Sequence, residues 1–76
     1  MRATILIHAQ EPQDAPGIVD AATVHGPAVL TAGPYDAIVE IDGNPDSLAR
    51  TVLEIQKIPG VSRTLTLAHV IPEPVH

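Results

Sequence analysis

The stretch Thr31-Ala32-Gly33-Pro34-Tyr35-Asp36 carries the residue types best suited to ligand chemistry in this chain. It holds the only aromatic residue, Tyr35, next to the carboxylate of Asp36, and Gly33 leaves the backbone open. Such a loop could form one wall of a small-molecule site. The same residues also suit a plain hairpin turn, because Gly33 permits positive φ and Pro34 pre-sets the turn. In that case Asp36 accepts hydrogen bonds from loop N–H groups, and both interpretations stay open here.

Other residues that perform chemistry are present, but their spacing predicts neither a metal site nor catalysis. The chain has four histidines, His8, His25, His69 and His76. No H-x-H or H-x₃-H spacing occurs among them, so we expect no metal. His8 and His69 are expected late in two antiparallel strands, and therefore at opposite ends of a sheet. No nucleophile–base pair is evident, so we expect no enzyme and no cofactor.

The composition is that of one small domain that is short of core-forming side chains. The chain has 76 residues, no Phe, Trp or Cys and a single Tyr, so Val, Ile, Leu and Ala must form the core. A domain of this size buries only roughly 60% of its unfolded surface, and no disulfide can stabilise it. Self-association extends the core across a subunit boundary, and we therefore expect an oligomer.

Charge and hydropathy argue against two kinds of partner. The net charge of −5 comes from nine acidic and four basic residues, with no Lys/Arg cluster to overcome repulsion by a phosphate backbone. We therefore expect no direct nucleic-acid binding. The apolar run at residues 5–7 is too short for a signal peptide, and no stretch approaches the roughly 20 apolar residues of a membrane span. The sequence favours a cytoplasmic domain without membrane contact.

Hydrophobic patterning predicts the order strand, helix, strand, strand, helix, strand. The expected elements are 2–8, 14–24, 28–31, 37–42, 45–58 and about 61–71, with an extended C-terminal tail over 71–76. Asp14 and Asn44 are the expected N-caps of the two helices. The first helix is the weaker one, because Gly17 lies inside it and Gly26-Pro27 ends it early.

This order predicts an α+β domain with the ferredoxin-like β-α-β-β-α-β arrangement, a four-stranded antiparallel sheet with two helices on one face. Period-two alternation places Leu6, Ile38 and Val70 on the opposite face, where they would lie in water. An apolar face of that kind is a predicted interface. Glu40 and Asp42 share one strand face, which we interpret as an edge toward solvent or a subunit contact.

Three segments match a known pattern: ILI at 5–7, TAGPYDAIV at 31–39 and IQKIPGVSRTLT at 55–66. In order and spacing, over nearly the full length, they resemble the ligand-binding module (RAM domain) of the Lrp/AsnC family, the leucine-responsive and asparagine-synthesis regulators. The last segment is the more specific one. The sequence departs from the family pattern at 12–28, where Pro16-Gly17 and Gly26-Pro27 crowd a segment shorter than the family's first helix.

The resemblance implies how the chain would associate. In the family two sheets pack face to face as a dimeric α+β barrel, and dimers often assemble into rings. Full-length members carry an N-terminal helix-turn-helix DNA-binding domain, so residues 1–76 would be a single, stand-alone effector-binding domain. The implied partners are a second copy in a homodimer, further copies in a higher homo-oligomer, DNA-binding Lrp/AsnC relatives in a hetero-assembly, and an amino-acid effector.

The resemblance also implies a ligand site between subunits, near the hairpin loop and the last strand. The matching positions are Gly33, Tyr35 and Asp36 in the loop, and Thr64 and Thr66 on the strand. A free amino acid needs N–H donors for its carboxylate and acceptors for its ammonium group, and an open loop with one carboxylate supplies both. The two threonines share one strand face, where Thr is also an ordinary strand residue.

We therefore expect a non-catalytic, oligomeric regulatory module that binds an amino acid or a related small metabolite at a subunit interface. One alternative is a small dimeric α+β-barrel enzyme, with a pocket in which His8 or His69 assists the chemistry. Another is an assembly subunit that binds no ligand.

Overall fold

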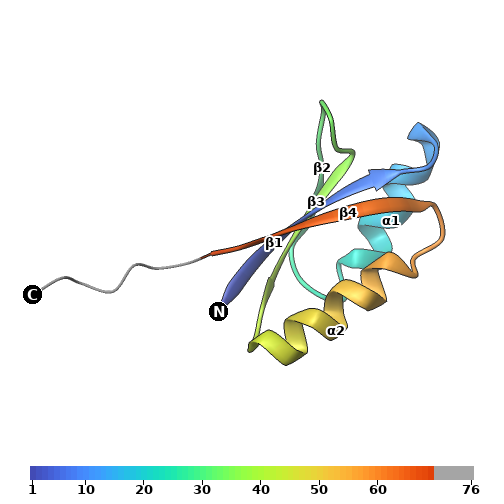
Figure 1. Cartoon of the computed structure of the whole chain (residues 1–76). Helices are drawn as coiled ribbons and strands as arrows, with labels where there is room; N and C mark the ends of the chain where they lie inside the picture. The colour runs from blue at the N-terminus through green and yellow to red at the C-terminus, as the bar shows by residue number, and fades with distance from the viewer. Residues whose placement is uncertain (70–76) are drawn as a thin grey trace, which may run out of the picture.

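The computed structural model describes residues 1–69 and follows the element order expected from the sequence (Figure 1). The elements are β1 (Arg2–Ala9), the short 3-10 helix η1 (Pro12–Asp14), α1 (Ala15–Ala22), β2 (Ala28–Leu30), β3 (Ala37–Asp42), α2 (Pro45–Gln56) and β4 (Val61–Ala68). The expectations for Val70, for a strand reaching Ile71, for His76 and for the tail at 71–76 fall outside the described residues.

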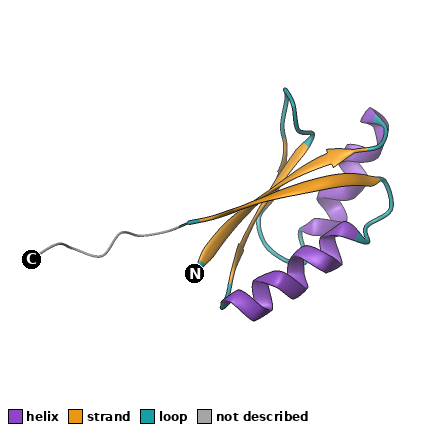
Figure 2. Cartoon of the chain, in the orientation of Figure 1, coloured by secondary structure: helices purple, strands orange, loops and turns teal. Residues whose placement is uncertain are grey.

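The strands form one four-stranded sheet in the order β2-β3-β1-β4, with every neighbouring pair antiparallel. Both helices lie on the same side of this sheet (Figure 2). The predicted ferredoxin-like α+β fold is thereby confirmed. Since β1 is central and β4 is an edge strand, the two strands that follow the helices lie on opposite sides of β1.

The core lies between the sheet and the helices. Along β1, Ala3, Ile5 and Ile7 are buried, while the residues between them are only half-buried. The helices contribute Ile18 and Ile55, both at most 1% exposed. The complete set of buried apolar residues is Ala3, Ile5, Ile7, Ala9, Ala15, Ile18, Ala22, Ala37, Val39, Ile41, Leu48 and Ile55. The core is therefore aliphatic, as the composition requires.

The second helix begins as predicted. Asn44 has an extended backbone, and its side-chain oxygen accepts a hydrogen bond from Ser47 N at 2.8 Å, while Pro45 occupies the first helical position. The first turn of a helix leaves N–H groups without partners. Asn44 satisfies one of them, and Pro45 has no N–H to satisfy.

The first helix differs from the prediction at both ends. Asp14 precedes it, but its side chain makes no capping hydrogen bond, because η1 has already set a helical backbone there. The helix ends at Ala22 rather than near Val24, whose side chain is 82% exposed. Thr23 follows the last helical residue and donates its hydroxyl hydrogen bond to Val19 O. The chain then passes close to β3 at Gly26, where a Cβ would overlap the backbone carbonyl of Glu40.

One strand is also shorter than expected, since β2 ends at Leu30 instead of Thr31. Within residues 1–69, no helix is long and apolar enough to cross a membrane.

Candidate functional site

The loop between β2 and β3 is a closed hairpin turn with an exposed tip. Thr31 N donates to Asp36 O at 3.0 Å, and the Thr31 hydroxyl donates to Tyr35 O at 2.8 Å. Gly33 has φ +117°, and a Cβ added there would meet nothing within 4 Å. The glycine is thus required by its backbone conformation and not by crowding. Tyr35 and Asp36 are half-buried, whereas Gly33 is exposed.

Asp36 links this loop to the end of β1 by two hydrogen bonds. Its N–H donates to Ile7 O at 2.9 Å, and its Oδ2 accepts from Ala9 N at 2.8 Å. At His8/Ala9 the register of β1 with β4 shifts, so the Ala9 N–H lies where regular pairing is interrupted. One carboxylate oxygen of Asp36 therefore has a structural role. Its Oδ1 makes no hydrogen bond to residues 1–69, and it is the oxygen that a ligand ammonium could contact.

Thr64 and Thr66 lie in a different place. They pair with Ile7 and Ile5 of β1, whose side chains are buried under the helices, so both threonines belong to the helix-covered face. Thr64 Oγ1 accepts a hydrogen bond from Gln56 Nε2 of α2 at 3.1 Å, while Thr66 is exposed. Their side chains therefore point to the helix side of β4, and no hydrogen bond within residues 1–69 joins either threonine to the hairpin loop. A site that uses both groups needs a second copy.

The face opposite the helices carries a continuous apolar row. Val29, Ile38, Leu6 and Leu65 are paired one to the next across β2, β3, β1 and β4. Val29 and Leu65 are 57% and 44% exposed, and Leu67, on the same strand as Leu65, is 48% exposed. Leu6 and Ile38 lie on this face as predicted. Sequence reasoning missed Val29 and left the side of Leu65 open, because only the strand register places them in this row.

The two ends of this helix-free face differ in charge. At one end His8 is paired with Arg63. At the other end Arg2 lies 3.3 Å from Asp42 and 3.9 Å from Glu40, which puts both carboxylates on the face predicted for them.

The two histidines of the sheet lie at opposite ends, as predicted. His8 is near the hairpin loop, and His69 Nε2 is 2.7 Å from Thr4 Oγ1 at the far end. In the described part of the chain, no three His, Asp or Glu residues are grouped closely enough to hold a metal ion. Residues 1–69 of a single chain also enclose no pocket.

The fold is shared with known bacterial proteins. TTHA0845 from Thermus thermophilus superposes with a TM-score of 0.84 at 23% identity, over 97% of this chain and 98% of that chain. E. coli AsnC matches with a TM-score of 0.78 at 22% identity, over 99% of this chain and 53% of AsnC. The feast or famine regulatory protein of M. tuberculosis, in a complex with L-methionine, matches with a TM-score of 0.63 at 16% identity, over 95% and 52% of the two chains.

The chain therefore spans about half the length of the two regulators and nearly all of TTHA0845. At these identities the structural similarity establishes the fold. The structural neighbours of this chain include Lrp/AsnC-type regulators, in agreement with the resemblance found in the sequence. No protein-family model matches the sequence, and no curated protein is significantly similar to it.

Proposed function

We propose that residues 1–76 form a single non-catalytic, oligomeric effector-binding domain that senses an amino acid or a related small metabolite between subunits. The observation that carries this proposal is the fold shared with AsnC and with a regulator complexed with L-methionine. Hetero-assembly with DNA-binding relatives in the cytoplasm would pass the signal on.

The helix-free face supports association with a second copy. Leu6 and Ile38 are half-buried there, and Val29 and Leu65, at the two ends of the row, remain about half exposed. Apolar surface buried between two sheets contributes about 25 cal/mol per Å², and packed sheets leave about 10 Å between their backbones. A face-to-face dimer would cover the row and would close the arrangement called a dimeric α+β barrel.

The hairpin loop supports an effector site at the rim of such a dimer. Gly33 leaves the loop tip open, Tyr35 offers an aromatic surface, and Asp36 keeps one carboxylate oxygen for an ammonium group. Thr64 and Thr66 would enter the same site only from another subunit, since within one chain they lie on the helix-covered face of the sheet.

A thermal-shift screen of the twenty amino acids tests the proposal. A ligand present at about ten times its Kd adds about 1.4 kcal/mol to the unfolding free energy, which corresponds to roughly 5–10 °C in Tm for a domain of this size. We expect at least one amino acid to give such a shift. If none of the twenty raises Tm at millimolar concentration, the proposed sensor function is wrong.

Asp36→Asn is the informative variant for the site. It keeps an oxygen that can accept from Ala9 N and removes the charge that an ammonium group would contact. We expect the ligand-induced shift to fall, with little change in the Tm of the ligand-free protein. Asp20→Asn, an exposed substitution on α1, is the matched control and should respond as the unaltered protein does.

A further inference from the structure

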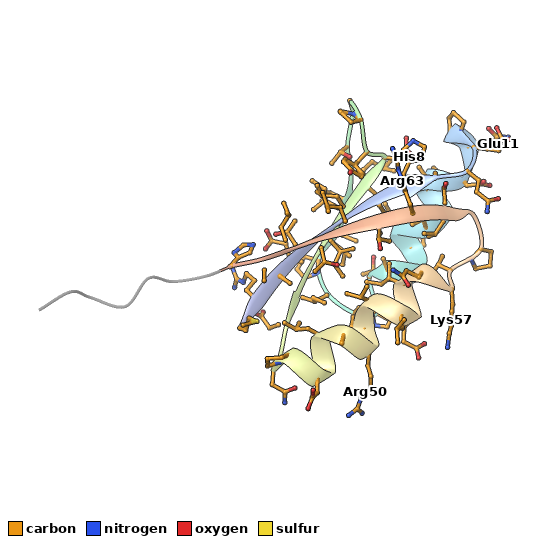
Figure 3. All side chains as sticks on the ribbon, in the orientation of Figure 1. His8, Glu11, Arg50, Lys57 and Arg63 are labelled. Carbon is orange, nitrogen blue, oxygen red and sulfur yellow. The ribbon has the colours of Figure 1, made fainter. Side chains whose placement is uncertain are left out.

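His8 and Arg63 form a polar pair at the loop end of the helix-free face. They are direct cross-strand partners on β1 and β4, two residues along each strand from Leu6 and Leu65. In an antiparallel sheet such partners have Cβ atoms about 4.5–5.5 Å apart on the same face. Figure 3 shows the two side chains next to each other, where β1 leads toward η1. Both therefore reach the same patch of surface.

The environment of His8 favours one arrangement of its ring proton. Its Nδ1 is buried without a hydrogen-bond partner, and it is the single buried side-chain nitrogen or oxygen of residues 1–69 in that state. An orphaned acceptor is tolerated better in a protein interior than an orphaned donor. In the neutral imidazole the proton therefore belongs on Nε2, which is not buried in this way. His8 then presents an N–H donor beside Arg63.

Arg63 adds a cation that no described residue neutralises. The ion pairs within residues 1–69 all involve Arg2, with Glu40 and Asp42. The Arg63 side chain is exposed, and Figure 3 shows Glu11, the residue before η1, apart from Arg63. A guanidinium offers several N–H donors in a planar fork and accepts nothing, which suits a carboxylate held by two hydrogen bonds.

We propose that His8 and Arg63 bind the carboxylate of the amino-acid effector. The pair presents donors only, so its ligand must offer acceptors, as a carboxylate does. This inference rests on the proposed function, and it assigns the carboxylate to side chains of the sheet in place of the hairpin backbone. The site lies beside the apolar row, so a second copy packed on that row would exclude water from it.

Asp36 makes a zwitterion the fitting ligand. It lies on the other side of His8 from Arg63, since its N–H and Oδ2 contact the backbone of Ile7 and Ala9. The Asp36 carboxylate reaches β1 at Ala9 N, and β4 with Arg63 is the next strand, about 4.8 Å farther on. The long side chain of Arg63 can therefore reach the carboxylate of an α-amino acid whose ammonium group contacts Asp36. The ammonium group would contact Asp36 and the carboxylate Arg63, with His8 between them.

Acetate is a probe that tests the pair without knowledge of the effector. The imidazole signals of His8 and the Nε signal of Arg63 are followed by NMR during titration with sodium acetate, at constant pH and at ionic strength matched with sodium chloride. We expect saturable shifts at both residues. Arg63→Gln should weaken the acetate affinity read from His8 by tenfold or more, and His8→Gln should weaken the affinity read from Arg63. Arg50→Gln, exposed on α2, should leave it unchanged.

The outcomes separate this inference from the proposed function. Equal shifts with chloride, or equal acetate affinity in Arg63→Gln and Arg50→Gln, would overturn the carboxylate site even if an amino acid binds elsewhere. If acetate binds and Arg63→Gln abolishes binding while no amino acid raises Tm, the anion site stands and the sensor function fails. Glycine that binds more tightly than N-acetylglycine supports the contact of the ammonium group with Asp36, and equal affinity contradicts it.

Discussion

The two faces of the sheet are formed by alternate residues of the same strands, yet one face is buried and the other is partly exposed to solvent. On the helix-covered face, Ile5, Ile7 and Val39 have no exposed surface. On the helix-free face, Leu65 and Val29 remain 44% and 57% exposed. The side chains are chemically alike, so the difference arises from what covers them. The helices cover one face only, while the strands carry apolar residues on both.

The difference between the two faces indicates which surface could add the apolar burial that a small domain needs for stability. The covered core contains no aromatic side chain, and five of its twelve members are alanine: Ala3, Ala9, Ala15, Ala22 and Ala37. Small side chains bury little area each. The apolar row on the other face includes Leu and Ile side chains, which are larger. They contribute hydrophobic stabilisation only when a second surface packs on them. We therefore expect the two faces to respond differently to the same kind of substitution.

The largest expected effect is on the covered face. Ile5→Ala removes a fully buried side chain and should lower the unfolding free energy by about 2–5 kcal/mol. The cost is internal to one chain, so it should not depend on protein concentration. Urea denaturation at two protein concentrations tenfold or more apart measures both points.

Leu6→Ala is the matched substitution, since Leu6 is the next residue of β1 and points to the other face. Its effect should be small in dilute protein and should grow with concentration, because a second copy completes its burial. If both variants lost the same free energy at every concentration, the two faces would be equivalent and the comparison would fail.

Much of this arrangement could be predicted from local patterns. Alternation along β1 located Ile5 and Ile7 on one face and Leu6 on the other, and burial follows that division. The start of α2 was predictable because Asn44 and Pro45 satisfy the needs of a helix N-terminus with residues adjacent in sequence. These features depend on the residue and its nearest neighbours.

The remaining features depend on the pairing register of the strands, which could not be predicted from the sequence. The side of Thr64 follows from its pairing with Ile7, and the partnership of His8 with Arg63 follows from the same ladder. The start of the first helix was mispredicted because η1 precedes it, and the close approach of Gly26 to the Glu40 carbonyl could not be read from the sequence. Such contacts join positions far apart in sequence.

A second comparison, with a smaller expected effect, is between a glycine packed on the helix-covered side and a glycine in the open hairpin loop. Gly60 and Gly33 both have positive φ, +94° and +117°. A Cβ at Gly60 would lie 2.8 Å from Asp14 Cβ, whereas at Gly33 it would meet nothing within 4 Å. Gly33→Ala should therefore cost only backbone strain, of order 1–3 kcal/mol. Gly60→Ala should cost about 1–3 kcal/mol more, from overpacking.

Chemical denaturation of the two variants measures this difference. A smaller loss for Gly60→Ala than for Gly33→Ala would show that the turn before β4 is not packed against the start of α1. It would then weaken the contrast between a close-packed covered side and an open loop.

The smallest effect on the folded monomer, and the sharpest test of the helix-free face, is expected for Leu65→Asp. Leu65 is 44% exposed at the end of the apolar row, so in a single chain the substitution should change the unfolding free energy by only about 0.5 kcal/mol. In a face-to-face dimer it would place a carboxylate against the apolar row of the second copy, which is strongly unfavourable. Light scattering at micromolar concentration should therefore find an oligomer for the unaltered protein and a monomer for Leu65→Asp. Leu53→Asp is the control, since Leu53 is 56% exposed on α2 and should leave association intact. A stable monomer for the unaltered protein, or equal dissociation in both variants, would show that the helix-free face is not the interface.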